Sequence, residues 1–106
     1  MDKRQAPRFK VRLPIAFLGL DLTGEGTVVN LSLEGCGIES DQNVQQGKQL
    51  TLRIFMPDQD ASVVVDRAQV RWTVRGLFGL EFLTIGSEEE ERLRRFLSTL
   101  ETQPGP

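Results

Sequence analysis

Apolar and polar residues alternate with a period of two along most of the chain. The first such run extends from Val11 to Phe17, and comparable runs follow it up to Phe82, separated by short polar or glycine-rich segments. This alternation is typical of strands with one buried face. Six strands are therefore predicted, at 11–17, 27–32, 35–38, 50–54, 63–72 and 78–82. Many short strands joined by glycine-rich turns indicate a small antiparallel barrel or sandwich.

Three local features refine this prediction. The segment Asp21–Gly26 (DLTGEG) is expected to form the turn between the first two strands. Pro14 cannot donate to a sheet ladder, so the first strand is expected at a sheet edge or beside a bulge. The long fifth strand is expected to bend near Arg67 and Ala68, where its alternation breaks.

The last element has a helical period. Leu93, Phe96, Leu97 and Leu100 form one apolar stripe, which predicts a helix over about 87–100. Ser87 and Glu90 have the spacing of a capping box at its start. This stripe would close one mouth of a barrel, and the alternative is a helix that binds a partner.

Composition and charge narrow the function. A chain of 106 residues is the size of one domain. It has no histidine and one cysteine, which argues against a histidine-based catalytic relay or metal site and against an internal disulfide. It lacks an apolar run long enough to span a membrane or to act as a signal peptide. These features favour a cytoplasmic binding protein over an enzyme.

The net charge of −2 is unevenly distributed. Residues 1–13 carry a net charge of +4, and the rest of the chain carries −6. A basic arm on an acidic body suits the capture of a small anion or docking on an acidic surface better than broad nucleic-acid binding. A solubilising tail is the plainer alternative.

Two motifs sit at informative places. Arg4 and Arg8 form an RxxxR pattern in the basic arm, and Asn30–Gly35 (NLSLEG) forms an NxSxxG pattern at the end of the second strand. Together with the element order, they resemble the PilZ domain, a bacterial receptor module for the second messenger cyclic di-GMP. The resemblance implies a six-stranded antiparallel β-barrel of the split-barrel type closed by a C-terminal α-helix. It places this domain at 11–101, after a flexible arm at 1–10 and before a disordered tail at 102–106.

The resemblance also implies a ligand site. Arg4 and Arg8 would wrap around cyclic di-GMP, because an arginine fork matches the acceptor edge of a guanine and pairs with phosphate. Asn30 and Ser32 would accept hydrogen bonds from the guanine, and Gly35 would permit backbone turning or close ligand approach. Equally, these last three residue types are those that build turns.

RxxxR also occurs starting at Arg8, Arg67 and Arg71, so the arm motif alone is weak. Arg12 forms the alternative RxxxR pattern with Arg8 and is expected to be an auxiliary ligand contact. Further auxiliary candidates are Lys3, Arg71 and Arg75. Trp72 and Phe78 are predicted to be core residues rather than stacking platforms, and Cys36 a small core residue.

The leading hypothesis is a receptor without cofactor or catalytic activity that acts through an unidentified effector protein. We expect that it does not bind nucleic acid, that it has no membrane span, and that it is a monomer or a homodimer. The alternative is a PilZ-fold interaction module that does not bind cyclic di-GMP. A nucleic-acid-binding barrel is the third hypothesis, disfavoured by the acidic body.

Overall fold

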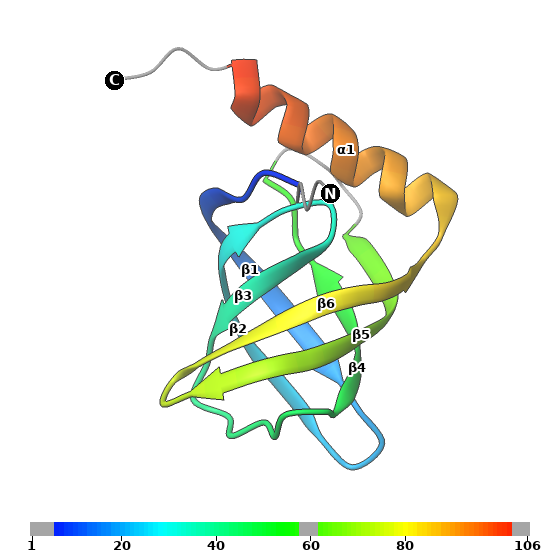
Figure 1. Cartoon of the computed structure of the whole chain (residues 1–106). Coiled ribbons are helices and arrows are strands. Elements are labelled where there is room, and N and C mark those ends of the chain that lie inside the picture. The colour runs from blue at the N-terminus through cyan, green and yellow to red at the C-terminus, as the bar shows by residue number, and fades with distance from the viewer. Residues whose placement is uncertain (1–5, 58–61, 103–106) are drawn as a thin grey trace, which may run out of the picture.

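Six antiparallel strands close into a barrel; numbered in chain order, they follow one another in the order 1-2-3-6-5-4, so that the first strand pairs with both the second and the fourth. The computed structural model describes residues 6–57 and 62–102. Figure 1 shows the barrel with the C-terminal helix across one end. The elements are β1 (Phe9–Leu18), β2 (Thr23–Leu31), β3 (Gly35–Glu39), β4 (Gln49–Ile54), β5 (Val63–Val74), β6 (Leu77–Ile85) and α1 (Ser87–Thr102). The predicted barrel with its C-terminal helix is confirmed.

The alternating apolar residues fill the interior of the barrel. Phe17 and Phe78 meet edge to face there, with ring centroids 5.5 Å apart, an arrangement that aromatic quadrupoles favour. Phe78 and Cys36 are both buried, as predicted. Burial raises the pKa of the Cys36 thiol to about 12, and the nearby Arg8 guanidinium offsets this slightly.

The start of β1 and the turn between β1 and β2 differ from their predicted positions. β1 begins at Phe9, inside the segment expected to be a flexible arm, because Phe9 extends the alternation and pairs with Leu31. The β1–β2 turn is at 19–22, where the Gly19 N–H donates to the Leu22 carbonyl at 2.7 Å, and not at 21–26. Gly24 belongs to β2, where it pairs with Phe17 of β1, and a Cβ there would lie 2.6 Å from the Phe17 ring.

Register shifts mark the other irregular places. β1 changes register against β2 between Lys10 and Leu13, just before Pro14. The ladder between β1 and β4 starts only at Ile15, one residue after Pro14, so the missing N–H interrupts neither pairing. β5 shifts on both sides of Arg67, where a bend was predicted.

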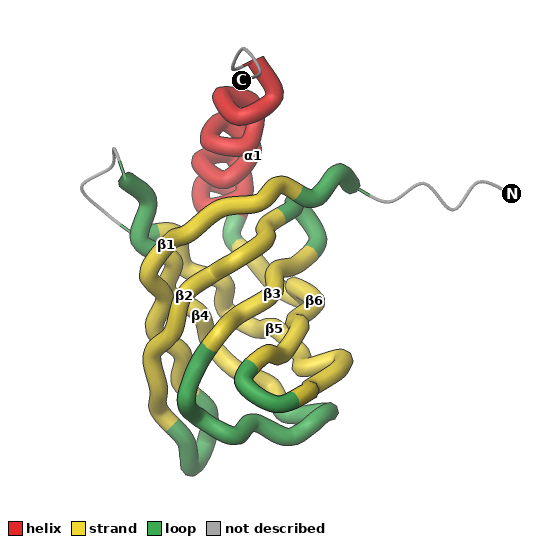
Figure 2. The backbone as a smooth tube through the Cα atoms, turned by 90° about the vertical axis from the view of Figure 1, so that its left-hand side faces the viewer, coloured by secondary structure: helices red, strands yellow, loops and turns green. Residues whose placement is uncertain are grey.

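The helix covers one mouth of the barrel (Figure 2). Leu93 and Leu97 are buried against the core, as the apolar stripe predicts. The Glu89 carboxylate accepts a hydrogen bond from the Val64 N–H at 2.8 Å, which fixes α1 to β5.

The predicted capping box is wrong by one residue. The first helical hydrogen bond runs from the Glu90 N–H to the Gly86 carbonyl at 2.8 Å, so Gly86 rather than Ser87 occupies the N-cap. Among the described residues, no helix is long and apolar enough to cross a membrane.

Candidate functional site

The NxSxxG segment forms the turn between β2 and β3, and Ser32 lies at its centre. The Ser32 side chain is 2% exposed. Its hydroxyl oxygen accepts hydrogen bonds from the Glu34 N–H at 3.0 Å and the Gly35 N–H at 3.2 Å. The Ser32 N–H donates to the Gly35 carbonyl at 2.9 Å. Ser32 thus satisfies the backbone of the turn, and its hydroxyl is already engaged there.

Gly35 is needed for close packing between strands. A Cβ at this position would lie 2.2 Å from the Leu80 carbonyl oxygen of β6, well inside contact distance. Among the described residues, positive φ angles occur only at Gly47 and Gly76. The backbone turning expected of Gly35 is therefore wrong, and the missing Cβ instead lets β3 approach β6.

Asn30 belongs to a row of residues that crosses the outer surface of the barrel. Lys10 pairs with Asn30, Asn30 with Gly37, Gly37 with Gly79, and Gly79 with Trp72. Opposed residues in antiparallel strands present their side chains to the same face. The chain neighbours of both glycines are buried in the core, so this row faces outward.

The two glycines let larger side chains lie down against the barrel. A Cβ at Gly37 would lie 2.6 Å from the Asn30 amide nitrogen, and a Cβ at Gly79 would lie 2.2 Å from the Trp72 indole nitrogen. We call Asn30, Gly37, Gly79 and Trp72 together the outer platform. The Asn30 amide and the Trp72 indole form its surface.

Trp72 was predicted to be a core residue, and this is wrong, because 45% of it is exposed. The register shift between Val70 and Trp72 keeps Val70 inside and turns Trp72 out. One signal in the sequence pointed to this: Gly79 lies between the buried Phe78 and Leu80, so it faces outward. An outward glycine beside an aromatic on the next strand is a common pairing in sheets.

Arg8 lies immediately before β1 and reaches the platform. One of its terminal nitrogens donates a hydrogen bond to the Asn30 side-chain oxygen. The structure thus brings together one residue from each motif, across 22 positions of the chain. Arg4 and Lys3 lie outside the described residues.

Two of the auxiliary arginines border the platform. Arg12 pairs with Glu39 at 3.4 Å, and the Arg71 Nε donates to Glu81 at 2.6 Å. Glu39 follows Gly37 by two residues and Glu81 follows Gly79 by two. Because β3 and β6 are antiparallel, these ion pairs lie on opposite sides of the platform.

Arg75 is not part of this group. It lies in the turn between β5 and β6, where the Gly76 carbonyl accepts a hydrogen bond from the Ser40 N–H at 3.1 Å. Three residue positions along β5 separate Arg75 from Trp72, which corresponds to roughly 10 Å.

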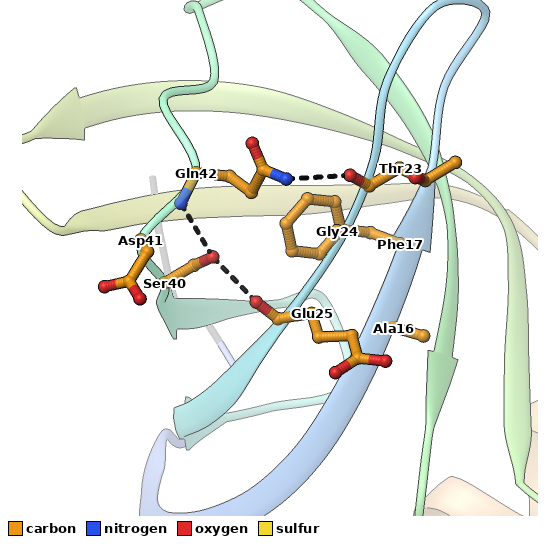
Figure 3. A pocket seen from close by; sticks show the side chains of 8 residues that line it. All are labelled: Ala16, Phe17, Thr23, Gly24, Glu25, Ser40, Asp41 and Gln42. Carbon is orange, nitrogen blue, oxygen red and sulfur yellow. Dashed lines mark hydrogen bonds between the residues drawn. The ribbon is translucent and has the colours of Figure 1, made fainter.

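A groove elsewhere on the barrel, with a volume of about 740 Å³, contains none of the predicted site residues (Figure 3). Its polar groups bond to one another: Ser40 donates to the Glu25 carbonyl at 2.7 Å, and the Gln42 amide donates to the Thr23 carbonyl at 2.9 Å. Its charged residues are Glu25 and Asp41. An acidic groove of this kind is a poor match for an anionic ligand.

A smaller cavity of about 260 Å³ connects the motifs with the helix. Pro7 and Phe9 of the N-terminal segment line it, together with Leu33 of the motif turn and Leu97 of α1. The residues on both sides of Arg8 therefore lie next to α1.

Comparisons with known proteins agree with this fold. No curated protein matches the sequence. The motility inhibitor MotI (DgrA) of Bacillus subtilis has the same fold, with a TM-score of 0.78 and 18% identity. The match covers 98% of this chain and 55% of that chain, so this chain spans about half of that protein.

Two isolated PilZ domains are also similar. The PilZ domain of YcgR from Escherichia coli, solved with c-di-GMP, has a TM-score of 0.74 and 19% identity, over 94% of this chain and 92% of that chain. The PilZ domain of CeSA from a cellulose-synthesizing bacterium has a TM-score of 0.70 and 13% identity, over 91% and 99%. At these identities the likeness shows the fold. A family model for the PilZ domain matches residues 2–99, and the chain belongs to the PilZ domain family.

Proposed function

We propose that this protein is a receptor for cyclic di-GMP without catalytic activity, and that the ligand binds over the outer platform. The observation that carries the proposal is the hydrogen bond between Arg8 and Asn30, one residue from each motif. The similar PilZ domain of Escherichia coli YcgR was solved with c-di-GMP, which supports this choice of ligand.

The chemistry of the two residues suits a guanine. Arg8 presents parallel N–H donors to the O6 and N7 acceptors of the base, and the Asn30 carbonyl oxygen accepts from its N–H groups. In the free protein one Arg8 nitrogen donates to the Asn30 side-chain oxygen. Binding therefore exchanges an exposed hydrogen bond for bonds to the ligand, and this costs little because water competes for the same groups. Arg4 would add a second guanidinium from the segment that precedes β1.

Ser32 and Gly35 serve the site indirectly. They hold the β2–β3 turn and the contact between β3 and β6, and so fix the position of Asn30 at the end of β2. Arg12 and Arg71 are already paired with exposed carboxylates. Exposed ion pairs of this kind contribute about 0–1 kcal/mol, so both arginines can exchange partners for a phosphate.

Ligand binding would change the position of the N-terminal segment relative to α1. Pro7 and Phe9 flank Arg8 and line the cavity shared with Leu33 and Leu97. A ligand that draws Arg8 across the platform displaces these neighbours relative to the helix. The exposed surface near α1 would then change, and an effector protein or a second copy would read that change.

Titration calorimetry with cyclic di-GMP tests the proposal, with GTP and cyclic di-AMP as controls. We expect heat with cyclic di-GMP alone, and a loss of at least tenfold in affinity for the double variant Arg4→Ala/Arg8→Ala. Arg53→Ala is the matched control, because Arg53 is an exposed arginine on β4 outside the platform. Absence of heat at about 100 μM protein, where sites of about −5 to −6 kcal/mol begin to register, would favour the interaction module instead.

A further inference from the structure

The first part of β2 has a neighbouring strand on one side only. Residues 23–26 pair with β1, but the ladder between β2 and β3 begins only at Thr27, opposite Glu39. After Glu39 the chain turns away from β2, and the Ser40 N–H donates to the Gly76 carbonyl in the turn between β5 and β6 at 3.1 Å. Among the described residues, the other edge of β2 at 23–26 therefore has no strand partner.

Side chains cover this open edge in place of a strand. The Ser40 hydroxyl donates to the Glu25 carbonyl at 2.7 Å, and the Gln42 side-chain amide donates to the Thr23 carbonyl at 2.9 Å (Figure 3). Both carbonyls belong to residues that line the groove of about 740 Å³. In an antiparallel ladder the N–H and C=O groups of one residue point to the same edge. Thr23 and Glu25 therefore each present one donor and one acceptor with the spacing that a further strand needs.

An aromatic ring lies beside this edge, inside the groove. Gly24 lies between the two residues that present the edge and pairs with Phe17 of β1. A Cβ at Gly24 would lie 2.6 Å from the Phe17 ring and 2.8 Å from the Gln42 Cγ, so both side chains use the space that a larger residue would fill. An apolar side chain that takes the place of Gln42 would lie against this ring, because alternate residues of an added strand face inward.

The charge of the groove is negative. Glu25 and Asp41 are its charged lining residues, and both are exposed. Within residues 6–57 and 62–102, neither carboxylate takes part in an ion pair. Arg75 lines an adjoining groove that both carboxylates also border, and it does not line this one. Two unpaired carboxylates beside an open strand edge favour a positively charged segment.

We propose that this groove binds an extended, basic segment of a partner protein, which adds to the open edge of β2 as a short strand. In strand addition the backbone hydrogen bonds give affinity, and alternate side chains give specificity. Lysine or arginine would face outward beside Glu25, and apolar residues would face inward against Phe17. The partner backbone replaces Ser40 and Gln42 at two carbonyls, and this exchange of exposed hydrogen bonds costs little.

This inference goes beyond the proposed function, because it assigns a partner surface apart from the outer platform and from α1. It does not depend on cyclic di-GMP. Its test therefore uses the full chain without that ligand, so that a failure here leaves the receptor function standing.

The probe is a heptapeptide of alternating lysine and valine, titrated into the labelled protein and followed by amide-resolved NMR. We expect saturable shifts that are largest at residues 23–25 and 40–42. A heptapeptide of alternating glutamate and valine is the charge control and should not bind.

Two N-methylated forms of the lysine peptide separate strand addition from attraction by charge. One is methylated at the lysine nitrogens and the other at the valine nitrogens. Only one of these two sets of N–H groups can face β2 in an added strand, so one form should bind about tenfold more weakly than the other. Attraction by charge alone would give both forms the same affinity.

A charge variant of the protein tests the carboxylates. Glu25→Gln/Asp41→Asn should weaken binding of the lysine peptide by about fivefold or more. Asp66→Asn/Glu88→Gln is the matched control, because it changes the net charge equally at two exposed carboxylates outside the groove.

A second variant tests the open edge and should bind more tightly than wild type. Gln42→Ala frees the Thr23 carbonyl and clears the space beside the Phe17 ring, so the affinity for the lysine peptide should rise by about two- to tenfold. Gln46→Ala is the matched control, an exposed glutamine of the same loop outside the groove.

Three results would overturn the proposal. The first is equal affinity of the two N-methylated peptides, and the second is equal affinity of the two charge variants. The third is the absence of saturable shifts at the groove in both wild type and Gln42→Ala, including the case in which the shifts occur at the N-terminal segment or α1 instead. Circular dichroism of each variant establishes that it is folded.

Discussion

The turn between β2 and β3 and the outer platform share one sequence motif but are built on opposite principles. In the turn, Ser32 is buried and Gly35 contacts the backbone of β6, so both are committed to the fold. On the platform, Asn30 lies at the surface and bonds to Arg8. The six residues of the motif therefore have two structural roles, and of Asn30, Ser32 and Gly35 only Asn30 lies on the outer platform. Alanine substitutions in the turn should therefore lower stability, and alanine substitutions on the platform should lower the affinity for cyclic di-GMP.

The largest effect is expected at Gly35. Gly35→Ala would place a methyl group 2.2 Å from the Leu80 carbonyl oxygen, and neither strand can move without disturbing the barrel. We expect a loss of about 3 kcal/mol or more in the free energy of unfolding, measured by urea denaturation. Gly86→Ala is the control, since its Cβ would have an ordinary contact at 3.7 Å with Glu89. Equal stability of the two variants would mean that the turn is not rigid.

The next effect contrasts the two polar residues of the motif. Ser32→Ala leaves the N–H groups of Glu34 and Gly35 without their acceptor, which should cost about 1–3 kcal/mol of stability. Asn30→Ala should change stability by about 0.5 kcal/mol or less and lower the affinity for cyclic di-GMP. Thermal unfolding and calorimetry on both variants test the contrast. The reverse pattern, with Asn30→Ala unstable and Ser32→Ala defective only in binding, would overturn it.

The smallest effect concerns Cys36, directly after the turn. Burial raises the pKa of this thiol from 9.0 to about 12, so the folded state keeps its proton where the unfolded state has lost it. Its contribution to stability is complete below pH 9 and falls as pH rises toward 12, by at most about 1.4 kcal/mol per pH unit. Urea unfolding of wild type and Cys36→Ala between pH 8 and pH 10 tests this.

Cys36→Ala has no thiol to ionise, so its stability should fall less steeply over that range. The arginines and lysines are common to both proteins, and the difference in slope isolates the thiol. Identical slopes would mean that the thiol ionises as readily in the folded state as in the unfolded state.

Local patterns determined much of this protein. The alternation of apolar residues predicts the six strands, and the stripe from Leu93 to Leu100 predicts the helix and its buried face. These predictions succeed because the period of a strand or helix is a property of neighbouring residues. The two motifs, with the element order, were sufficient to indicate the PilZ family. Arg8 and Asn30, one residue from each motif, are joined by a hydrogen bond, and their role in binding stays a prediction.

The contacts of Gly24, Gly35 and Gly79 were decided by the tertiary structure. Gly24 is predicted in a turn, yet it pairs with Phe17 in the ladder between β1 and β2, and the Phe17 ring occupies the space that a Cβ would need. Gly35 lies against the backbone of β6 at Leu80, and Gly79 lies under the Trp72 indole of β5. Trp72 faces outward because of a register shift between β5 and β6. Register and close approach depend on strands that are distant in the chain, so the residues at each position cannot reveal them until the barrel has closed.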